Sequence, residues 1–284
     1  MIKLIECPRD AIQGISTFIP TKEKAAYINQ LLKVGFDTID FGSFVSPKAI
    51  PQLSDTAEVL DLLEMEQTTS KLLAIVANSR GGKSAASYAK ISYLGFPFSI
   101  SETFQLRNTN STIRDSLHIV RELCDICEAN EKQLVIYISM GFGNPYGDDW
   151  SPQIVCYWLE QLHQLGVKIF AISDTIGVAD PENIHALFSQ IIPQYSYLEI
   201  GAHFHTPPQH WESKFEAALS AGCARFDGAI KGFGGCPMAK DELTGNMATE
   251  HMIHKLNQLG IPNHILLDEL EKSIEMATKM IPLL

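Results

Sequence analysis

Two histidines and a carboxylate, far apart in the chain, are residue types that can hold a divalent metal ion. His203 and His205 are separated by one residue at the end of the apolar stretch 198–204. In an extended strand alternate side chains point the same way, so this spacing can present both imidazoles to one ion, although two structural histidines are the commoner outcome. Asp10, which follows an early apolar stretch, would complete the set. With a carbonyl-type fourth ligand, these donors favour an octahedral Mg²⁺ or Mn²⁺ over tetrahedral zinc.

Three further residues could act on a substrate beside such an ion, which would polarise hydroxyl and carbonyl oxygens. Arg9 could stabilise an enolate or carboxylate oxygen, although a surface ion pair is the commonest fate of an arginine. Asp40 lies at the end of the apolar stretch 37–41. Cys236 lies in the segment GFGGCPMAK, whose glycines would let it close over a ligand and bring a thiol to it. An incidental cysteine in a flexible turn accounts for that spacing equally well.

Two other motifs carry no function. Cys124 and Cys127 form a CxxC, but the surrounding stretch has helical periodicity and the chain has no second CxxC, so we expect two small side chains on a buried helix face. Gly82-Lys83-Ser84 resembles the end of a phosphate-binding loop, yet Ala77 stands where that loop needs its first glycine. With six cysteines in 284 residues, we expect free thiols rather than a disulfide scaffold.

Short apolar stretches alternate with longer amphipathic ones, which predicts strands and helices in turn. We expect eight strands, at 2–6, 37–41, 72–77, 91–96, 134–139, 168–173, 198–204 and 224–230. Their near-continuous apolarity is typical of parallel strands that are buried on both faces. Amphipathic helices are expected between them, for example at 21–35, 113–130 and 151–166. Eight strand–helix alternations favour an α/β fold of the closed (β/α)8 TIM-barrel type over an open sheet.

This fold predicts where the polar residues meet. Catalytic groups of such barrels come from the carboxyl ends of several strands, so residues that are scattered in the sequence are expected to converge at one rim. Besides those named above, the polar residues at or after strand ends are Ser43, Ser101, Glu102, Asp174 and Thr175. We expect one catalytic domain over 1–284, with C-terminal helices from about 248 packing on the barrel, around 248–259 and 267–281. These helices could also carry a homodimer contact.

Composition excludes several classes of partner. The 33 Asp and Glu against 22 Lys and Arg give a formal charge of −11, which argues against binding to nucleic acid or to an anionic membrane. No apolar run approaches the roughly 20 residues that span a bilayer, and the N-terminus has no basic and apolar leader. A hydrophobic content of 45% is ample for a folded core. We expect a cytoplasmic protein with a small-molecule substrate.

Five segments, in this order along the chain, resemble the 3-hydroxy-3-methylglutaryl-CoA (HMG-CoA) lyase family: ECPRDAIQG, IDFGSFVSPKAIPQ, SDTIGVADP, HFH and GGCPMAKDELTGNMATE. The similarity covers nearly the whole chain. The RD pair and the HxH pair are shared by a wider superfamily of metal-dependent barrels that includes isopropylmalate synthase, homocitrate synthase and hydroxy-oxo-acid aldolases. The GGCP and FVSPK motifs are more specific to the lyase branch.

The resemblance implies a carbon–carbon lyase that cleaves HMG-CoA to acetyl-CoA and acetoacetate by retro-Claisen chemistry, as in leucine degradation. The metal ligands that it implies are Asp10, His203, His205 and Asn246. The catalytic residues that it implies are Arg9 at the thioester oxygen, Cys236 in proton transfer near the enolate, and Asp40. Arg9 and Gln13 would contact the acyl-CoA substrate.

Two alternatives remain open on the sequence. The loops 143–149 and 206–210 depart from the family pattern, which would fit a related metal-dependent aldolase or Claisen-type synthase acting on another hydroxy acyl-CoA or a hydroxy-oxo acid. The other alternative is a barrel with a decayed site that serves as a scaffold, and the presence of every expected ligand argues against it.

Overall fold

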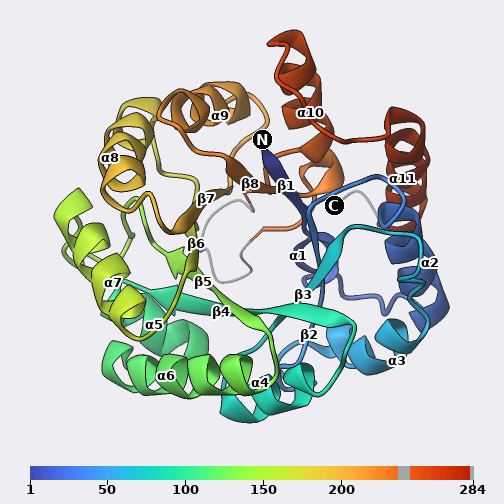
Figure 1. The fold of residues 1–284 in the computed structure, drawn as a ribbon, viewed down its shortest axis with the longest axis horizontal. Helices are drawn as coiled ribbons and strands as arrows, with labels where there is room; N and C mark the ends of the chain where they lie inside the picture. The colour runs from blue at the N-terminus through green and yellow to red at the C-terminus, as the bar shows by residue number, and fades with distance from the viewer. Residues whose placement is uncertain (236–243, 282–284) are drawn as a thin grey trace.

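The computed structural model describes residues 1–235 and 244–281. Within these ranges eight parallel strands pair in sequence order, and β8 pairs with β1 to close a barrel (Figure 1). The strands are β1 (Lys3–Glu6), β2 (Thr38–Ser43), β3 (Lys71–Ile75), β4 (Ile91–Ser99), β5 (Gln133–Ser139), β6 (Ile169–Asp174), β7 (Glu199–Phe204) and β8 (Arg225–Gly228). The predicted (β/α)8 barrel is confirmed, and each predicted strand overlaps an observed one.

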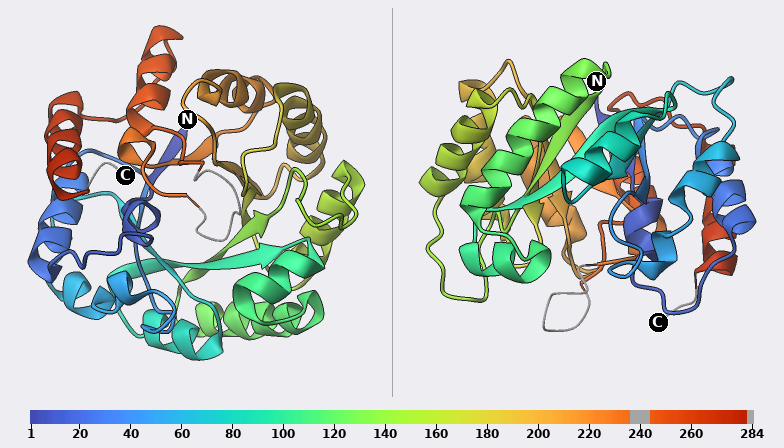
Figure 2. Two further views of the ribbon diagram at one scale, coloured as in Figure 1. Left: turned by 180° about the vertical axis from the view of Figure 1, so that it is seen from behind. Right: turned by 90° about the horizontal axis from the view of Figure 1, so that it is seen from below.

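Helices surround the strands as an outer ring (Figures 1 and 2). The α-helices of the described ranges are α1 (Pro8–Ile12), α2 (Thr21–Leu31), α3 (Thr56–Asp61), α4 (Ser79–Ala86), α5 (Glu102–Thr109), α6 (Ile113–Ala129), α7 (Pro152–Gln164), α8 (Pro181–Gln194), α9 (Trp211–Ser220), α10 (Thr249–Gln258) and α11 (Leu267–Met280). Two short 3₁₀ helices are η1 (Pro51–Leu53) and η2 (Ile230–Gly232). In the described ranges no helix combines the length and apolarity needed to cross a bilayer.

Local sequence signals fix where several helices begin. The Ser151 side chain accepts a hydrogen bond from the backbone N–H of Ile154, and Pro152 occupies the first turn of α7, as expected of an N-cap followed by proline. Thr112 and Asp115 form a reciprocal capping box at the start of α6. Cys127 lies buried on α6 with Cys124 half-buried beside it, and both are free thiols, which confirms the structural interpretation of the CxxC.

The barrel interior has an apolar half and a charged half. Side chains from β3 to β6 form one buried cluster, made of Leu73, Ile75, Tyr93, Val135, Tyr137, Ile169 and Ala171. The strands that close the barrel, β7, β8, β1 and β2, bring buried polar groups instead, among them His203, Arg225, Asp227 and Asp40. Because alternate residues of a strand share a face, this division is set by residue type on each inward position. The named charged side chains of the interior therefore lie on the side of the barrel that these four strands form.

The two C-terminal helices pack against the ring at the point where the chain closes on itself. α11 lies along α2 (Figure 1), and the Gln30 side-chain amide donates to both the backbone carbonyl and the carboxylate of Glu269. α10 lies near α9, where Lys255 pairs with Glu212 and Glu216. The helices predicted around 248–259 and 267–281 are therefore present and cover the β8–β1 side.

Candidate metal centre and active site

The predicted pair of histidines and Asp10 meet at the carboxyl end of the barrel. His203 lies near the end of β7, His205 follows that strand, and Asp10 lies in α1, directly after β1. One ligand atom from each residue lies within 4.8 Å of the others, and all three residues are buried. The Nε2 atom of His205 is 3.8 Å from Oδ2 of Asp10. Closure of the barrel through β8 brings together residues that are about two thirds of the chain apart.

His205 is oriented with one nitrogen toward the backbone and the other toward the cluster. Its Nδ1 lies 3.0 Å from the carbonyl oxygen of Thr175, so Nδ1 carries the proton and donates it. Its Nε2 is buried and has no hydrogen-bond partner. Burial lowers the pKa of His205 to about 4, against the opposing effect of the Asp10 charge, so the ring is neutral at neutral pH. A neutral ring with an unpartnered buried lone pair is what a metal ligand requires.

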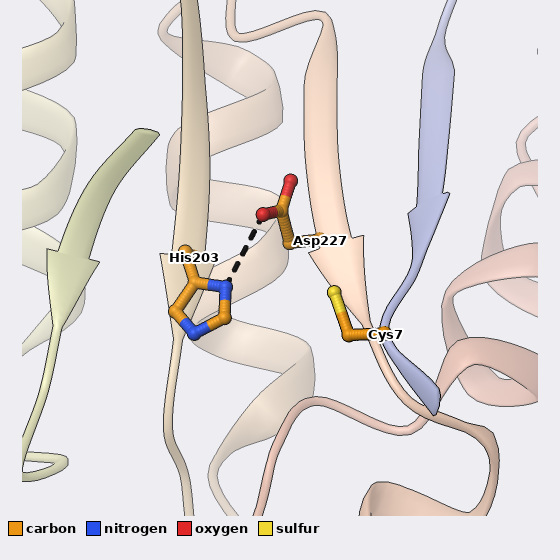
Figure 3. A group of neighbouring side chains, drawn as sticks. All are labelled: Cys7, His203 and Asp227. Carbon is orange, nitrogen blue, oxygen red and sulfur yellow. Dashed lines mark hydrogen bonds and ion pairs between the residues drawn. The ribbon is translucent and has the colours of Figure 1, made fainter. Parts of the chain in front are cut away.

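His203 is oriented by a carboxylate. Its Nδ1 lies 3.2 Å from Oδ2 of Asp227, which neighbours it on β8, and the other ring nitrogen points away from this contact (Figure 3). The rings of His203 and Tyr137 form a T-shaped pair, with ring centroids 5.4 Å apart at an interplanar angle of 84°. Both histidines therefore have one ring nitrogen engaged and line the same cavity.

Arg9 links the metal cluster to a second buried carboxylate. Its Nη2 is 2.6 Å from Oδ2 of Asp40, and its Nε also donates to that carboxylate. Its Nη1 donates to Asp10 and to Oε1 of Gln13, at 3.0 and 2.9 Å. Burial disfavours the charge on Asp10, but Arg9 and both histidines together hold the pKa of Asp10 below its ordinary value. Burial raises the pKa of Asp40, despite the opposing effect of Arg9.

Asn246 lies against the cluster, and Cys236 lies outside the described residues. Asn246 pairs with His205 through an isolated bridge, and its Nδ2 lies 2.6 Å from Oδ2 of Asp10. In this orientation the amide presents a donor nitrogen, whereas a ligand role needs the opposite orientation with Oδ1 toward the ion. The position agrees with a fourth ligand, and the ligand role of Asn246 stays a prediction.

The donor set fits a divalent cation. It combines two imidazoles with one carboxylate and leaves one side of the cluster open to the cavity. The orphaned Nε2 of His205 is an independent sign, because a buried acceptor without a partner is costly unless a ligand satisfies it. The carboxylate suits hard ions such as Mg²⁺ and Mn²⁺, and the imidazoles widen the choice toward other divalent metals.

A cavity of about 450 Å³ opens beside the cluster. Its polar wall includes Arg9, Asp10, Gln13, His203 and His205. Its apolar wall includes Val45, Ile50, Ile75, Pro97 and Phe104. Asp40, which is fully buried, does not line it and reaches it only through Arg9. The volume is within the usual range for small-molecule sites.

The other polar residues expected at the rim have different roles. Thr175 lines the cavity and orients His205, as above. Ser101 caps α5, and Glu102 accepts a hydrogen bond from the backbone N–H of Ile113. Asp174 is buried in an ion pair with Lys214 on α9, with Nζ to Oδ2 at 2.7 Å. Ser43 is buried and donates to the Ile75 carbonyl.

Sequence reasoning missed Asp227, Arg225 and Lys214. A usable signal was present for the first two, since a predicted strand that carries Arg and Asp two positions apart places both charges on one face. For Lys214 the sequence shows only one lysine on an amphipathic helix, and lysines there are mostly exposed.

The comparisons with known proteins agree with this geometry. The HMGL-like family model matches residues 2–276. A hydroxymethylglutaryl-CoA lyase of Bacillus subtilis is 32% identical over 93% of this chain and 87% of its own length. The cytoplasmic 3-hydroxy-3-methylglutaryl-CoA lyase of Rattus norvegicus is 30% identical over 92% of this chain and 75% of its own.

A solved structure has nearly the same fold. An HMG-CoA lyase from Acinetobacter baumannii, in complex with coenzyme A and 3-methylmalate, superposes with a TM-score of 0.92. It is 30% identical, and the match covers 99% of this chain and 91% of that one. With a family model that spans almost all of the sequence and a relative at 32% identity, the chain belongs to the HMGL-like family.

Proposed function

We propose that this protein is a carbon–carbon lyase that cleaves HMG-CoA to acetyl-CoA and acetoacetate. The observation that carries the proposal is the buried cluster of Asp10, His203 and His205, with Arg9 beside it on the wall of one cavity. Membership of the HMGL-like family and the lyase activity of the relatives support the same reaction. The aldolase or synthase alternative is not favoured, because these relatives are lyases.

The reaction breaks the bond between C2 and C3 of the acyl group. The C3 hydroxyl loses its proton, C3 becomes the ketone of acetoacetate, and the bonding electrons form the enolate of acetyl-CoA, which is then protonated at C2. A divalent ion of the Mg²⁺ or Mn²⁺ class, held by Asp10, His203, His205 and Asn246, would act as a Lewis acid toward the hydroxyl and carboxylate oxygens. Arg9 would stabilise the negative charge that develops on the thioester oxygen.

The remaining predicted residues have distinct roles in this proposal. Gln13 lines the cavity next to Arg9 and would contact the substrate. Asp40 would act through Arg9, because three donor–acceptor contacts fix the guanidinium on it. Cys236, beyond the described residues, is proposed to transfer a proton near the enolate, so Cys236→Ala would lower turnover by orders of magnitude.

The test is a coupled assay for acetyl-CoA formed from HMG-CoA, with and without added Mg²⁺ or Mn²⁺. We expect cleavage that depends on the metal, is abolished by EDTA and is lost in Asp10→Ala. Acetoacetate must appear in equal amount with acetyl-CoA. Tight metal binding without either product would contradict the proposed substrate.

Location and assembly are separate proposals. A cytoplasmic location is supported by the rat relative, which is named as cytoplasmic. Fractionation of the source cells tests it. A place in leucine degradation is proposed from the reaction alone. A homodimer through the C-terminal helices stays a prediction, and light scattering on the purified chain would decide between one copy and two.

A further inference from the structure

A line of buried charges runs inside the barrel behind the metal cluster. On β8, Asp227 lies directly opposite His203 of β7, and Arg225 is two residues earlier on the same inner face. Asp227 is 2% exposed and Arg225 is 3% exposed. Charged residues are almost never buried this fully unless they are paired. The pairing therefore indicates what the two residues do.

Asp227 divides its two oxygens between the histidine and the arginine. Oδ2 lies 3.2 Å from Nδ1 of His203, and Oδ1 lies 2.8 Å from Nη1 of Arg225. Arg225 is held from the other side, since its Nε lies 3.2 Å from Oε1 of Glu199. A carboxylate that is fixed at one oxygen by a guanidinium can present the other oxygen in only one direction, which is toward the imidazole.

The neighbouring strand makes room for this arrangement. Gly201 lies on β7 between Glu199 and His203, on the same inner face. A Cβ atom at Gly201 would lie 2.8–2.9 Å from the Cβ, Cγ and Cδ atoms of Arg225, so the arginine stem crosses this strand where a side chain is missing. The φ angle of Gly201 is not in the left-handed region, and the close approach explains the glycine.

Cys7 completes the group drawn in Figure 3, where its thiol lies close to His203 and Asp227. Cys7, His203 and Asp227 do not form a second metal site. The Nδ1 of His203 is committed to Asp227, and the other oxygen of Asp227 is committed to Arg225. Cys7 is fully buried, and its thiol lies within 4.8 Å of a ligand atom of each of the other two residues.

We propose that Asp227, clamped by Arg225, is a positioning residue that fixes the tautomer and the orientation of His203, so that Nε2 faces Asp10 and His205. The inference rests on the proposed metal-dependent function for its consequence in catalysis. One oxygen of Asp227 already accepts from Arg225, and the other accepts from Nδ1–H of His203, so Nε2 is the nitrogen that carries the lone pair in the neutral ring. Partners of this kind typically change metal affinity by ten- to a hundred-fold.

The first measurement is the dissociation constant for Mn²⁺. Binding is monitored through the electron paramagnetic resonance signal of the free ion. We expect Asp227→Ala to weaken binding by roughly ten- to a hundred-fold. Asp227→Asn has a single acceptor oxygen, which the donor-only guanidinium of Arg225 takes, so its amide NH₂ group faces Nδ1 of His203; this variant should lose Mn²⁺ affinity as Asp227→Ala does and favour the Nε2–H tautomer. Asp55→Asn is the matched control, because it breaks another buried pair, with Lys24 outside the barrel at 2.7 Å, and should change affinity less than twofold.

The second measurement needs neither metal nor substrate. A long-range ¹H–¹⁵N spectrum of the metal-free protein reports the tautomer of each of the nine histidines, and the loss of one signal set in His203→Gln assigns that residue. We expect His203 as the Nδ1–H tautomer in the wild type and as a mixture in Asp227→Ala. Gly201→Ala, which displaces Arg225 and leaves Asp227 in place, should shift the same signals by less.

The outcomes separate this inference from the proposed function. Unchanged Mn²⁺ affinity or an unchanged His203 tautomer in Asp227→Ala would overturn the positioning role. If Asp227→Ala does not fold, Asp227→Asn and Gly201→Ala decide by the same two measurements. A wild type that binds no Mn²⁺ would overturn the metal centre, while the tautomer comparison would still decide the role of Asp227.

Discussion

At the residue scale, the guanidinium group of Arg9 is fixed in orientation, because it donates hydrogen bonds from several of its nitrogens. Asp40 takes Nε and Nη2, while Asp10 and Gln13 take Nη1. Burial opposes the charge on Arg9, but the two carboxylates raise its pKa further above the ordinary value, so the cation is permanent. A cation fixed before the reaction stabilises developing charge without reorganising during it.

Lysine at this position would keep the charge and lose the geometry. We predict that Arg9→Lys lowers kcat by roughly 10²–10³-fold with a smaller change in KM, because one ammonium cannot bind Asp40 and also face the thioester oxygen. Steady-state rates with HMG-CoA measure this. Arg121→Lys, on the exposed face of α6, is the control and should leave both constants unchanged. A rate within threefold of wild type in Arg9→Lys would contradict the proposed role.

At the element scale, one lysine holds two strand ends together at the metal rim. Lys214 on α9 donates to Asp174 at the end of β6, to the carbonyl of Gly177 in the next loop, and to the carbonyl of His205. Asp174 in turn accepts from the backbone N–H groups of Val178 and Ala179. The loop that supplies Thr175 to orient His205 is therefore fixed by a helix outside the barrel.

Removing this lysine should cost stability. We predict that Lys214→Met lowers the free energy of unfolding by about 3–5 kcal/mol, since it leaves the buried Asp174 carboxylate without its cation. Urea unfolding followed by circular dichroism measures the change. Lys255→Met is the comparison, because its partners Glu212 and Glu216 are about half exposed, and little change is expected there. If both variants lost the same free energy of unfolding, burial of the ion pair would not determine how much the lysine contributes to stability.

Glu6 plays a comparable part where the barrel closes. It lies in β1 and is fully buried, and it accepts hydrogen bonds from the backbone N–H of Ile230 in η2 and from the hydroxyl of Thr249 in α10. Burial raises the pKa of Glu6 from 4.5 to about 8, against the opposing effect of these two donors. The first strand is thereby tied to the elements that follow the last strand.

This shift predicts how stability depends on pH. The folded protein keeps a proton on Glu6 that the unfolded chain releases near pH 4.5, so the stabilisation is complete below that pH and is lost as pH rises toward 8. Glu6→Gln does not titrate. Its stability relative to wild type should therefore increase across pH 5–8, by on the order of 5 kcal/mol at most. Urea unfolding midpoints at several pH values test this. If the stability of Glu6→Gln changed with pH in the same way as that of the exposed control Glu128→Gln, the prediction would be wrong.

At the scale of the whole molecule, periodicity was sufficient to predict the barrel and not sufficient to predict its interior. Strands that are apolar on both faces can be recognised in the sequence, and the barrel rule then brings Asp10 near His205 without any contact being known. The contact between Asp227 and Arg225 and its link to His203 were missed. The partners of an inward-facing charge depend on which strands lie beside it in the closed barrel. Thr175 was expected at the rim, but its role depends on a backbone carbonyl, which no residue type reveals.

Because distant residues converge at the metal cluster, binding of the ion should stabilise the whole fold. Asp10 and the two histidines are separated by about two thirds of the chain and meet only when β8 pairs with β1. An ion that they share therefore binds the folded state and not the unfolded chain. At a hundred times its dissociation constant it stabilises the fold by about 2.7 kcal/mol, which for a chain of this length corresponds to a rise in Tm of roughly 4–5 °C.

We predict this rise for the wild type with Mn²⁺ and its loss in Asp10→Ala, measured by differential scanning calorimetry after EDTA treatment. Asp55→Asn should melt at a lower temperature and still show the full rise, because its pair with Lys24 lies among the outer helices. An equal rise in Asp10→Ala would mean that Mn²⁺ binds elsewhere. If Mn²⁺ raises Tm only when Asp10 and His205 are both present, the ion is bound by these two residues. In that case the residues that hold the ion also join the strands that close the barrel.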